Sequence, residues 1–228
     1  MADRREGRRA WLKAIAGGAL GAAGAGGFIA EALAKGDLPA TSGLHRLEGT
    51  ATINGQPAKV GTPVAVGDRV VTGPGSQAVV VLKGDAYLLR AATIVEFRGR
   101  EGVLDRLLID TGKVLSVFSK RPLAIQAATA TIGIRGTGCY IEVDPGSVYF
   151  CLCYGEAAIE GPGIEAARAV KTSHHEEPLL LTDAGGRLHI APGNFRDHTD
   201  AELVMLEALV GREPPFMQGG GRYPANRY

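Results

Sequence analysis

Excess charge, aromatic residues and long apolar runs are all scarce in this chain of 228 residues. Lys and Arg number 25 against 24 Asp and Glu, and aromatic residues make up only 6%. Beyond residue 34 the balance is 20 basic against 21 acidic residues, so the body of the chain is close to neutral. Such a body lacks the positive field that binds phosphate backbones, and we expect no nucleic-acid partner. No segment beyond residue 34 is long and apolar enough to cross a membrane.

The first 34 residues have the pattern of an export signal. A basic start is followed by the Gly/Ala-rich stretch AIAGGALGAAGAGGFIAEALA, and Ala32-Leu33-Ala34 offers a cleavage site. The basic start resembles the twin-arginine (Tat) translocation motif, although Gly7 and Trp11 stand where Ser and Phe are usual. The residues that carry this resemblance are Arg8, Arg9, Trp11, Leu12 and Lys13. We therefore expect a periplasmic protein that contacts the membrane only if the signal stays uncleaved. The alternative is an inner-membrane anchor that faces the periplasm.

Residues 45–163 predict an all-β domain. Short runs of Val, Ile, Leu and Thr recur about every ten residues and are punctuated by Gly, Pro, Asn and Asp. Asn54-Gly55 is a strong hairpin signal, and Asp144-Pro145-Gly146-Ser147 indicates a second hairpin. VLDRLLI and KVLSVF are expected as separate strands. We expect stacked or rolled antiparallel sheets.

Residues 164–213 predict a C-terminal extension with strands and one short helix near 200–210. Thr199 followed by Glu202 forms a capping box, and Gly211 is a plausible stop. Residues 214–228 are expected to form a flexible tail.

Three glycines crowd into the stretch TIGIRGTGCYIEV at residues 131–143. A phosphate-binding loop would need a helix after the glycines, and here a β-like run follows instead. We therefore expect Gly133, Gly136 and Gly138 to allow a strand–turn–strand corner. Arg135 could lock that corner by bonding carbonyls or a carboxylate.

The segment ATIGIRGT resembles the signature of the FecR domain family, which occurs in periplasmic regions of ferric-citrate-type signalling regulators. VGDRVVTGPGSQAVVVLKGD, LIDTGKV and the YGEA of residues 154–157 resemble further family elements, so the likeness covers about residues 60–163. Ile125-Gln126-Ala127 and Gly138-Cys139 depart from the usual pattern. The resemblance implies a non-catalytic β-domain with the structural motif Gly133, Arg135, Gly136 and Thr137. Because only about a dozen residues precede the apolar stretch, we expect no cytoplasmic anti-sigma domain.

Cysteine is scarce, and all three cysteines fall within fifteen residues, at Cys139, Cys151 and Cys153. Cys151 and Cys153 point to one face of a strand because side chains alternate. A symmetric hairpin would place Cys139 opposite Leu152 on the other face, whereas a bulge would bring it beside Cys151 or Cys153. In an oxidising periplasm one disulfide among the three is a candidate.

The alternative for these thiols is a metal or redox site. Cys-x-Cys offers two soft ligands on one face, and a polar loop with His174 and His175 could fold over it. Zn or Cu would accept such a set, with His189 and His198 as further candidates. The leading expectation is a non-enzymatic envelope module without a cofactor that binds an envelope protein or extracytoplasmic ligand. The alternative is a periplasmic metal-binding or thiol-redox protein that uses Cys151, Cys153, His174 and His175.

Overall fold

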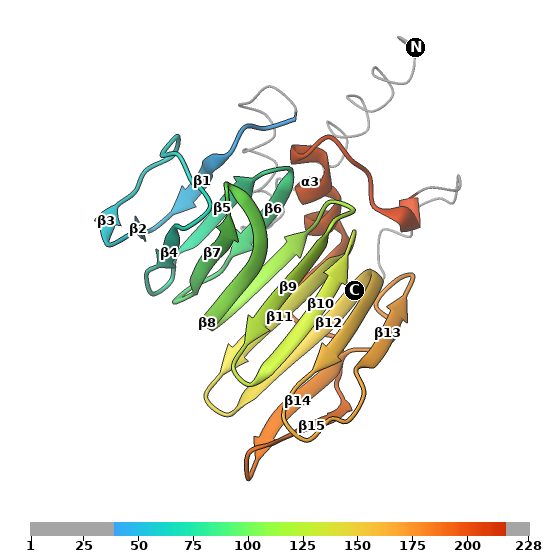
Figure 1. Cartoon of the computed structure of the whole chain (residues 1–228). Helices are drawn as coiled ribbons and strands as arrows, with labels where there is room; N and C mark the ends of the chain where they lie inside the picture. Colours follow the sequence, from blue (N-terminus) through green and yellow to red (C-terminus); the bar gives the residue numbers. More distant parts are fainter. Residues whose placement is uncertain (1–38, 218–228) are drawn as a thin grey trace.

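The computed structural model describes residues 39–217, and these residues build an all-β fold with one α-helix (Figure 1). The predicted export signal at 1–34 and its motif lie outside the described residues. The described part contains no helix with the length and hydropathy needed to span a bilayer. The elements are β1 (Gly43–Glu48), β2 (Ala51–Ile53), β3 (Gln56–Pro57), β4 (Arg69–Thr72), β5 (Gln77–Leu82), β6 (Asp85–Leu89), β7 (Ile94–Arg100), β8 (Val103–Val117), β9 (Pro122–Ala127), β10 (Ala130–Arg135), β11 (Gly138–Asp144), β12 (Ser147–Glu160), β13 (Arg168–Thr172), β14 (Leu179–Ala184), β15 (Arg187–Pro192), α3 (Asp200–Leu209) and a 3-10 turn η1 (Pro215–Met217).

The strands form two sheets that share the long strands β8 and β12. Sheet A has the order β1-β5-β6-β8-β11-β12-β14-β15, and sheet B has the order β3-β2-β4-β7-β8-β9-β10-β12-β13. Strands β8, β11, β12, β10 and β9 close a hydrogen-bonded ring, around which the other strands extend (Figure 1). The predicted antiparallel pairing is confirmed except between β8 and β9, which are parallel.

Two glycines let β8 and β12 pass from one sheet to the other. Gly112 has φ +94° and Gly155 has φ +101°, and a Cβ on either would overlap a threonine side chain. Such left-handed residues bend a strand without ending it. The prediction that VLDRLLI and KVLSVF are separate strands is therefore wrong, because the chain continues through Gly112 as β8.

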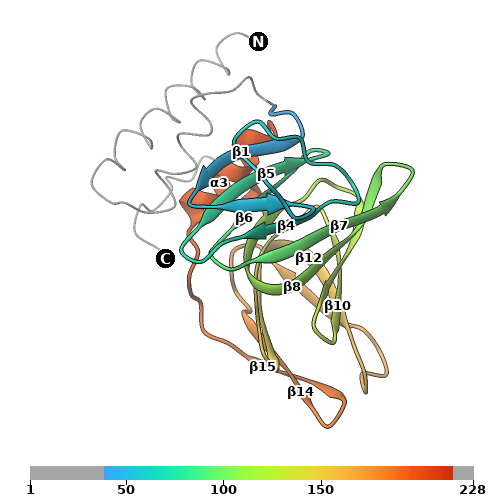
Figure 2. The same ribbon diagram turned by 90° about the vertical axis from the view of Figure 1, so that its left-hand side faces the viewer.

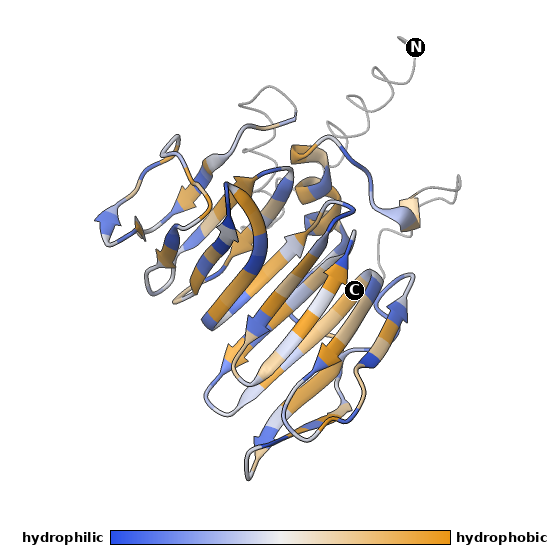
Figure 3. Ribbon diagram, viewed as in Figure 1, coloured by the Kyte–Doolittle hydropathy of each residue, from blue (hydrophilic) through white to orange (hydrophobic). Residues whose placement is uncertain are grey.

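A large apolar core fills the space between the sheets. Its members come from the inward faces of both sheets, for example Val80 and Tyr87 of sheet A and Phe97 and Leu107 of sheet B. In Figure 3, orange residues recur along most strands, in keeping with burial on one or both faces.

Helix α3 covers the outer face of sheet A, where it contacts β6 and β8 (Figure 2). A second apolar cluster joins Leu203, Leu206 and Leu209 of the helix to the sheet. The predicted helix and its capping box are confirmed. Thr199 is the N-cap, and the Glu202 carboxylate accepts a hydrogen bond from the backbone N–H of Thr199. Gly211, with φ +76°, follows the helix end.

The glycine-rich stretch forms the expected corner between β10 and β11. Gly136 has φ +63°, and a Cβ on Gly138 would lie 2.5 Å from the ring of Tyr154. Gly133 has room to spare, since its nearest contact beyond neighbouring residues would be at 3.8 Å. The Arg135 side chain is exposed and forms no side-chain hydrogen bond or close ion pair with any residue in 39–217. A hydrogen bond from Lys171 lowers the pKa of Glu156 on β12, and the charge of Arg135 only adds to this effect.

The segment after residue 164 is part of both sheets. β13 joins sheet B and β14 joins sheet A, and each pairs with a different half of β12. Residues 215–217, which the sequence assigns to a tail, form η1, whose Phe216 ring lies 5.9 Å from that of Tyr154.

Candidate metal centre

The two faces of β12 separate the three cysteines. Cys139 pairs with Leu152 in the register of β11 and β12, so it faces the core between the sheets. Cys151 and Cys153 face the opposite side, toward α3. All three cysteines are free, and the candidate disulfide of Cys139 is not formed. The physical reason is the two-residue turn at Pro145-Gly146, which keeps Cys139 on the opposite face.

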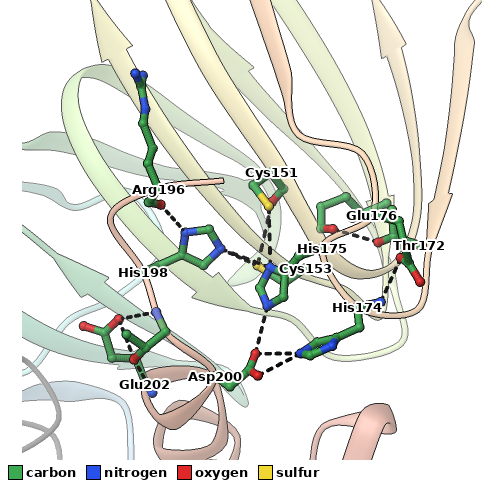
Figure 4. Close-up of polar contacts among 12 residues, drawn as sticks. Cys151, Cys153, Thr172, His174, His175, Glu176, Arg196, His198, Asp200 and Glu202 are labelled. Atoms are coloured by element: carbon green, nitrogen blue, oxygen red, sulfur yellow. Dashed lines mark hydrogen bonds and ion pairs between the residues drawn. The ribbon is translucent and has the colours of Figure 1, made fainter. Parts of the chain in front are cut away.

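Two histidines from later segments meet Cys151 and Cys153 on this outer face (Figure 4). His175 lies in the loop between β13 and β14, and His198 lies just before α3. The two sulfur atoms and one nitrogen of each histidine all lie within 4.8 Å of one another. All four residues are buried: the cysteines are 0% exposed, His175 6% and His198 3%. Together, Cys151, Cys153, His175 and His198 are called the Cys2His2 cluster below.

The spacings inside the Cys2His2 cluster match the edges of a tetrahedral zinc site. Zn–S bonds of about 2.3 Å and Zn–N bonds of about 2.05 Å imply edges of about 3.3 Å (N···N) and about 3.6 Å (S···N). Here Nδ1 of His175 lies 3.2 Å from Nε2 of His198. Sγ of Cys151 lies 3.6 Å from Nδ1 of His175, and Sγ of Cys153 lies 3.4 Å from Nε2 of His198. A single ion can therefore fit among these atoms with small adjustments.

The far side of each imidazole is held as in known metal sites, where a carboxylate or carbonyl fixes the ring and its tautomer. Nε2 of His175 bonds Oδ1 of Asp200 at 2.9 Å. Nδ1 of His198 bonds the carbonyl oxygen of Arg196 at 2.7 Å. When these nitrogens carry the protons, the other nitrogen of each ring presents its lone pair to the cluster.

Local structure explains how His175 reaches the site. Its backbone N–H donates to the carbonyl of Cys153 at 3.0 Å, and its φ of +57° lies in the left-handed region. The Glu176 carboxylate accepts from the backbone N–H groups of Ser173 and His174 at 2.7 and 2.8 Å, which closes the loop. A non-glycine residue with positive φ often marks a site where strain is held for function.

Aromatic rings surround the imidazoles. Tyr140 stacks on His198 with ring centroids 4.6 Å apart, and Phe195 lies 4.8 Å from His175 and 4.5 Å from His198. This packing limits the access of water and of reagents to the sulfur atoms.

The thiols and His175 have perturbed pKa values. A hydrogen bond from Cys153, and further ones from His175 and His198, outweigh burial and hold the pKa of Cys151 well below its usual range. Burial raises the pKa of Cys153 well above its usual range. Burial alone would lower the pKa of His175, but hydrogen bonds with Asp200 and Cys151 raise it to about 9. A thiolate beside a positively charged imidazole is an arrangement that a metal cation can replace.

His174, predicted as a ligand, lies outside the Cys2His2 cluster. Its Nε2 bonds both oxygens of Asp200 at 2.9 and 2.8 Å, and its side chain is 29% exposed. It lines a surface pocket of about 480 Å³ together with Phe216 and Tyr154. His189 is exposed on β15, outside the cluster.

His198 and Asp200 carry more of the site than the sequence indicates. The sequence pattern gives His198 only as a further candidate ligand and does not single out Asp200, because both lie beside the predicted capping box of the helix. The sequence feature that points to them is their position directly before and after Thr199, the predicted N-cap of the helix.

Comparison with known proteins adds little. No family model and no curated protein match the chain. The matching solved structures include two crystal structures of a "putative anti-sigma factor" from Parabacteroides distasonis ATCC 8503. Each is 14% identical with a TM-score of 0.45, and the match covers 54% of this chain and 59% of that chain. At this level the likeness carries no argument about fold or function.

Proposed function

We propose that this protein binds one zinc ion at the Cys2His2 cluster and acts as a non-enzymatic binding and sensing module of the cell envelope. The observation that carries the metal proposal is the set of ligand spacings of 3.2, 3.4 and 3.6 Å between atoms of four buried side chains. Two histidine nitrogens held by Asp200 and by a backbone carbonyl support it.

Zinc suits this donor set better than iron–sulfur clusters or oxygen-preferring ions do. Two thiolates and two imidazoles in a tetrahedral arrangement are typical of zinc. A Rieske-type iron–sulfur cluster also takes two cysteines and two histidines, but it holds them on two different irons. The S···N spacings of 3.4 and 3.6 Å found here suit ligands on a single ion. A divalent ion with two thiolates and two neutral imidazoles is electrically neutral, which reduces the cost of burying it. Oxygen-preferring ions such as Mg²⁺ and Ca²⁺ do not suit this set.

A metal-binding role fits the site better than thiol-redox chemistry. The low pKa of Cys151 is typical of a reactive thiol, but its side chain is fully buried and a reactive cysteine has to be accessible. A site with four protein ligands also leaves no coordination position for a substrate. Both points support a non-enzymatic role.

The location in the cell envelope rests on the sequence. The twin-arginine resemblance of residues 8–13 and the FecR resemblance of residues 60–163 both favour an exported β-domain. An envelope protein or extracytoplasmic ligand would be the partner of such a module.

Metal analysis of purified protein tests the proposal. We expect about one zinc per chain after reconstitution, lost in Cys151→Ser and retained in the matched control Cys139→Ala. Cys139 is an equally buried cysteine on the other face of the sheet, so the pair separates ligation from loss of a thiol. Cobalt substitution should give the absorption of a tetrahedral site with thiolate ligands. A folded protein without bound zinc, or with equal zinc in both variants, would disprove metal binding at this cluster.

A further inference from the structure

We propose that the metal latches helix α3 onto sheet A, so that loss of the ion releases the helix and uncovers the apolar face beneath it. This inference rests on the proposed zinc site and concerns its regulatory consequence. In the metal-bound protein α3 covers this face of sheet A, and in the metal-free protein α3 is released from it.

The ligands connect parts of the chain that are far apart in sequence. Cys151 and Cys153 belong to β12, a strand inside sheet A. His198 lies in residues 193–199, which connect β15 to α3 without regular structure and are called the lead-in segment below. The helix begins two residues after His198, and its first residue, Asp200, bonds the ligand His175. Metal bonds at this point would join the start of α3 directly to the sheet.

The surface beneath the helix is strongly apolar. Leu203, Leu206 and Leu209 of α3 are each at most 1% exposed and pack against the outer face of sheet A. The sheet residues of this cluster that are 0% exposed include Val79, Val81, Leu88, Leu115 and Val117. A contiguous face of this kind, once uncovered, is typical of a surface that binds another chain.

Without the ion, no metal bond joins His198 to the sheet. Nδ1 of His175 and Nε2 of His198 lie 3.2 Å apart, and Sγ of Cys153 lies 3.4 Å from Nε2 of His198. A metal ion would replace these contacts by direct bonds from β12 and the loop before β14 to the lead-in segment. In the proposed latch, His198 moves away from the sheet when these bonds are absent and carries the lead-in segment with it.

The lead-in segment has other contacts of differing strength. Lys113 pairs with Asp197, and because these side chains are 39% and 51% exposed this pair contributes little to stability. Arg196 pairs with Glu142, whose side chain is 4% exposed, and the Arg196 guanidinium lies 4.3 Å from the ring centroid of Tyr149. Arg90 bonds the backbone carbonyl of Asp197 and the buried carboxylate of Glu202. The latch predicts that metal bonds, added to these contacts, decide whether α3 stays docked.

The helix itself depends on being docked. It has ten residues, which is too short to persist alone in water. Three of its carboxylates, Asp200, Glu202 and Glu207, are at most 3% exposed and depend on partners in the docked position. Because the buried Asp200 carboxylate bonds the proposed ligand His175, a bound metal also holds the partner of Asp200 in place.

Hydrogen–deuterium exchange of the zinc-loaded and chelator-treated protein tests the latch. We expect amides of residues 198–210 to exchange at least about tenfold faster without metal, and re-addition of zinc to restore protection. Amides of β9 and β10, on the far side of the core, should not change. Cys151→Ser with zinc present should behave as the metal-free protein, and Cys139→Ala as the loaded protein.

Limited trypsin digestion gives a second measurement on the same samples. Arg196 and Arg212 flank α3, with side chains 45% and 30% exposed. If the helix is released, trypsin should cleave after Arg196 and Arg212 faster in the metal-free protein than in the zinc-loaded protein.

The outcomes separate the latch from the zinc site. Zinc that binds stoichiometrically without changing protection of α3 overturns the latch and leaves the metal site intact. Loss of protection throughout both sheets on chelation also overturns it, because the ion would then stabilise the whole domain. Absence of zinc binding in the folded protein refutes the metal site, and the latch fails with it.

Discussion

Replacing Asp200 by alanine should weaken zinc binding without removing a ligand. Asp200 accepts a hydrogen bond from Nε2 of His175 at 2.9 Å, and the two side chains are 2% and 1% exposed. A buried hydrogen bond to a charged group contributes about 1.5–3 kcal/mol. At about 1.4 kcal/mol per factor of ten, this corresponds to about 10- to 100-fold in affinity. Loss of an outer partner of a ligating histidine in known sites has a similar effect.

Competition with a chromophoric chelator would measure this change. The matched control is His174→Ala, which removes the bond from His174 to Asp200 but leaves the one that His175 donates to Asp200. We expect the control to lose clearly less affinity than Asp200→Ala. If Asp200→Ala folds and binds zinc within about threefold of the unchanged chain, the carboxylate does not orient His175 and the reasoning is refuted.

Two further predictions concern the fold. Burial raises the pKa of Asp85, and hydrogen bonding to Ser119 and the charge of Arg121 only partly offset it. Arg121→Met should therefore lower the free energy of unfolding by about 3 kcal/mol near neutral pH, at the low end for a broken buried pair because Arg121 is 25% exposed. Because the folded pKa of Asp85 lies above its unfolded pKa, protonated Asp85 stabilises the fold at low pH, and this stabilisation is lost as the pH rises. The free energy of unfolding lost in Arg121→Met should therefore be smaller at about pH 5 than at about pH 8. Denaturant titration with chelator present measures this loss, and an equal loss at both pH values would contradict this cause. Gly138→Ala should cost about 1–3 kcal/mol, because its Cβ would lie 2.5 Å from the ring of Tyr154, whereas Gly133→Ala should stay within about 0.5 kcal/mol. Thermal unfolding of the two variants compares them directly, and equal losses would show that the contact at Gly138 does not decide the cost.

Local sequence patterns predicted much of the fold. The Asn54-Gly55 turn lies between β2 and β3, with positive φ at both residues. Thr199 and Glu202 form the expected capping box at the start of α3. These features depend on residues a few positions apart, and so they can be identified from the chain order alone.

The same patterns could not show where strands pass between sheets. Gly112 and Gly155 look like ordinary strand breaks in sequence, but each lies inside a continuous strand. Whether a glycine ends a strand or bends it depends on the partners on either side, and these come from distant segments.

From the order of residues alone it follows that Cys151 and Cys153 share one face of a strand, since side chains alternate along any strand. The capped helix after His198 follows from local sequence in the same way. Which histidines meet these cysteines depends on the folded arrangement of the chain. His175 lies 24 residues from Cys151 and His198 lies 45 residues from Cys153, and the loop after β13 and the docking of α3 bring them together. Contacts over such separations depend on how the two sheets and the helix pack, so the donor set of the proposed zinc site becomes visible only in the folded chain.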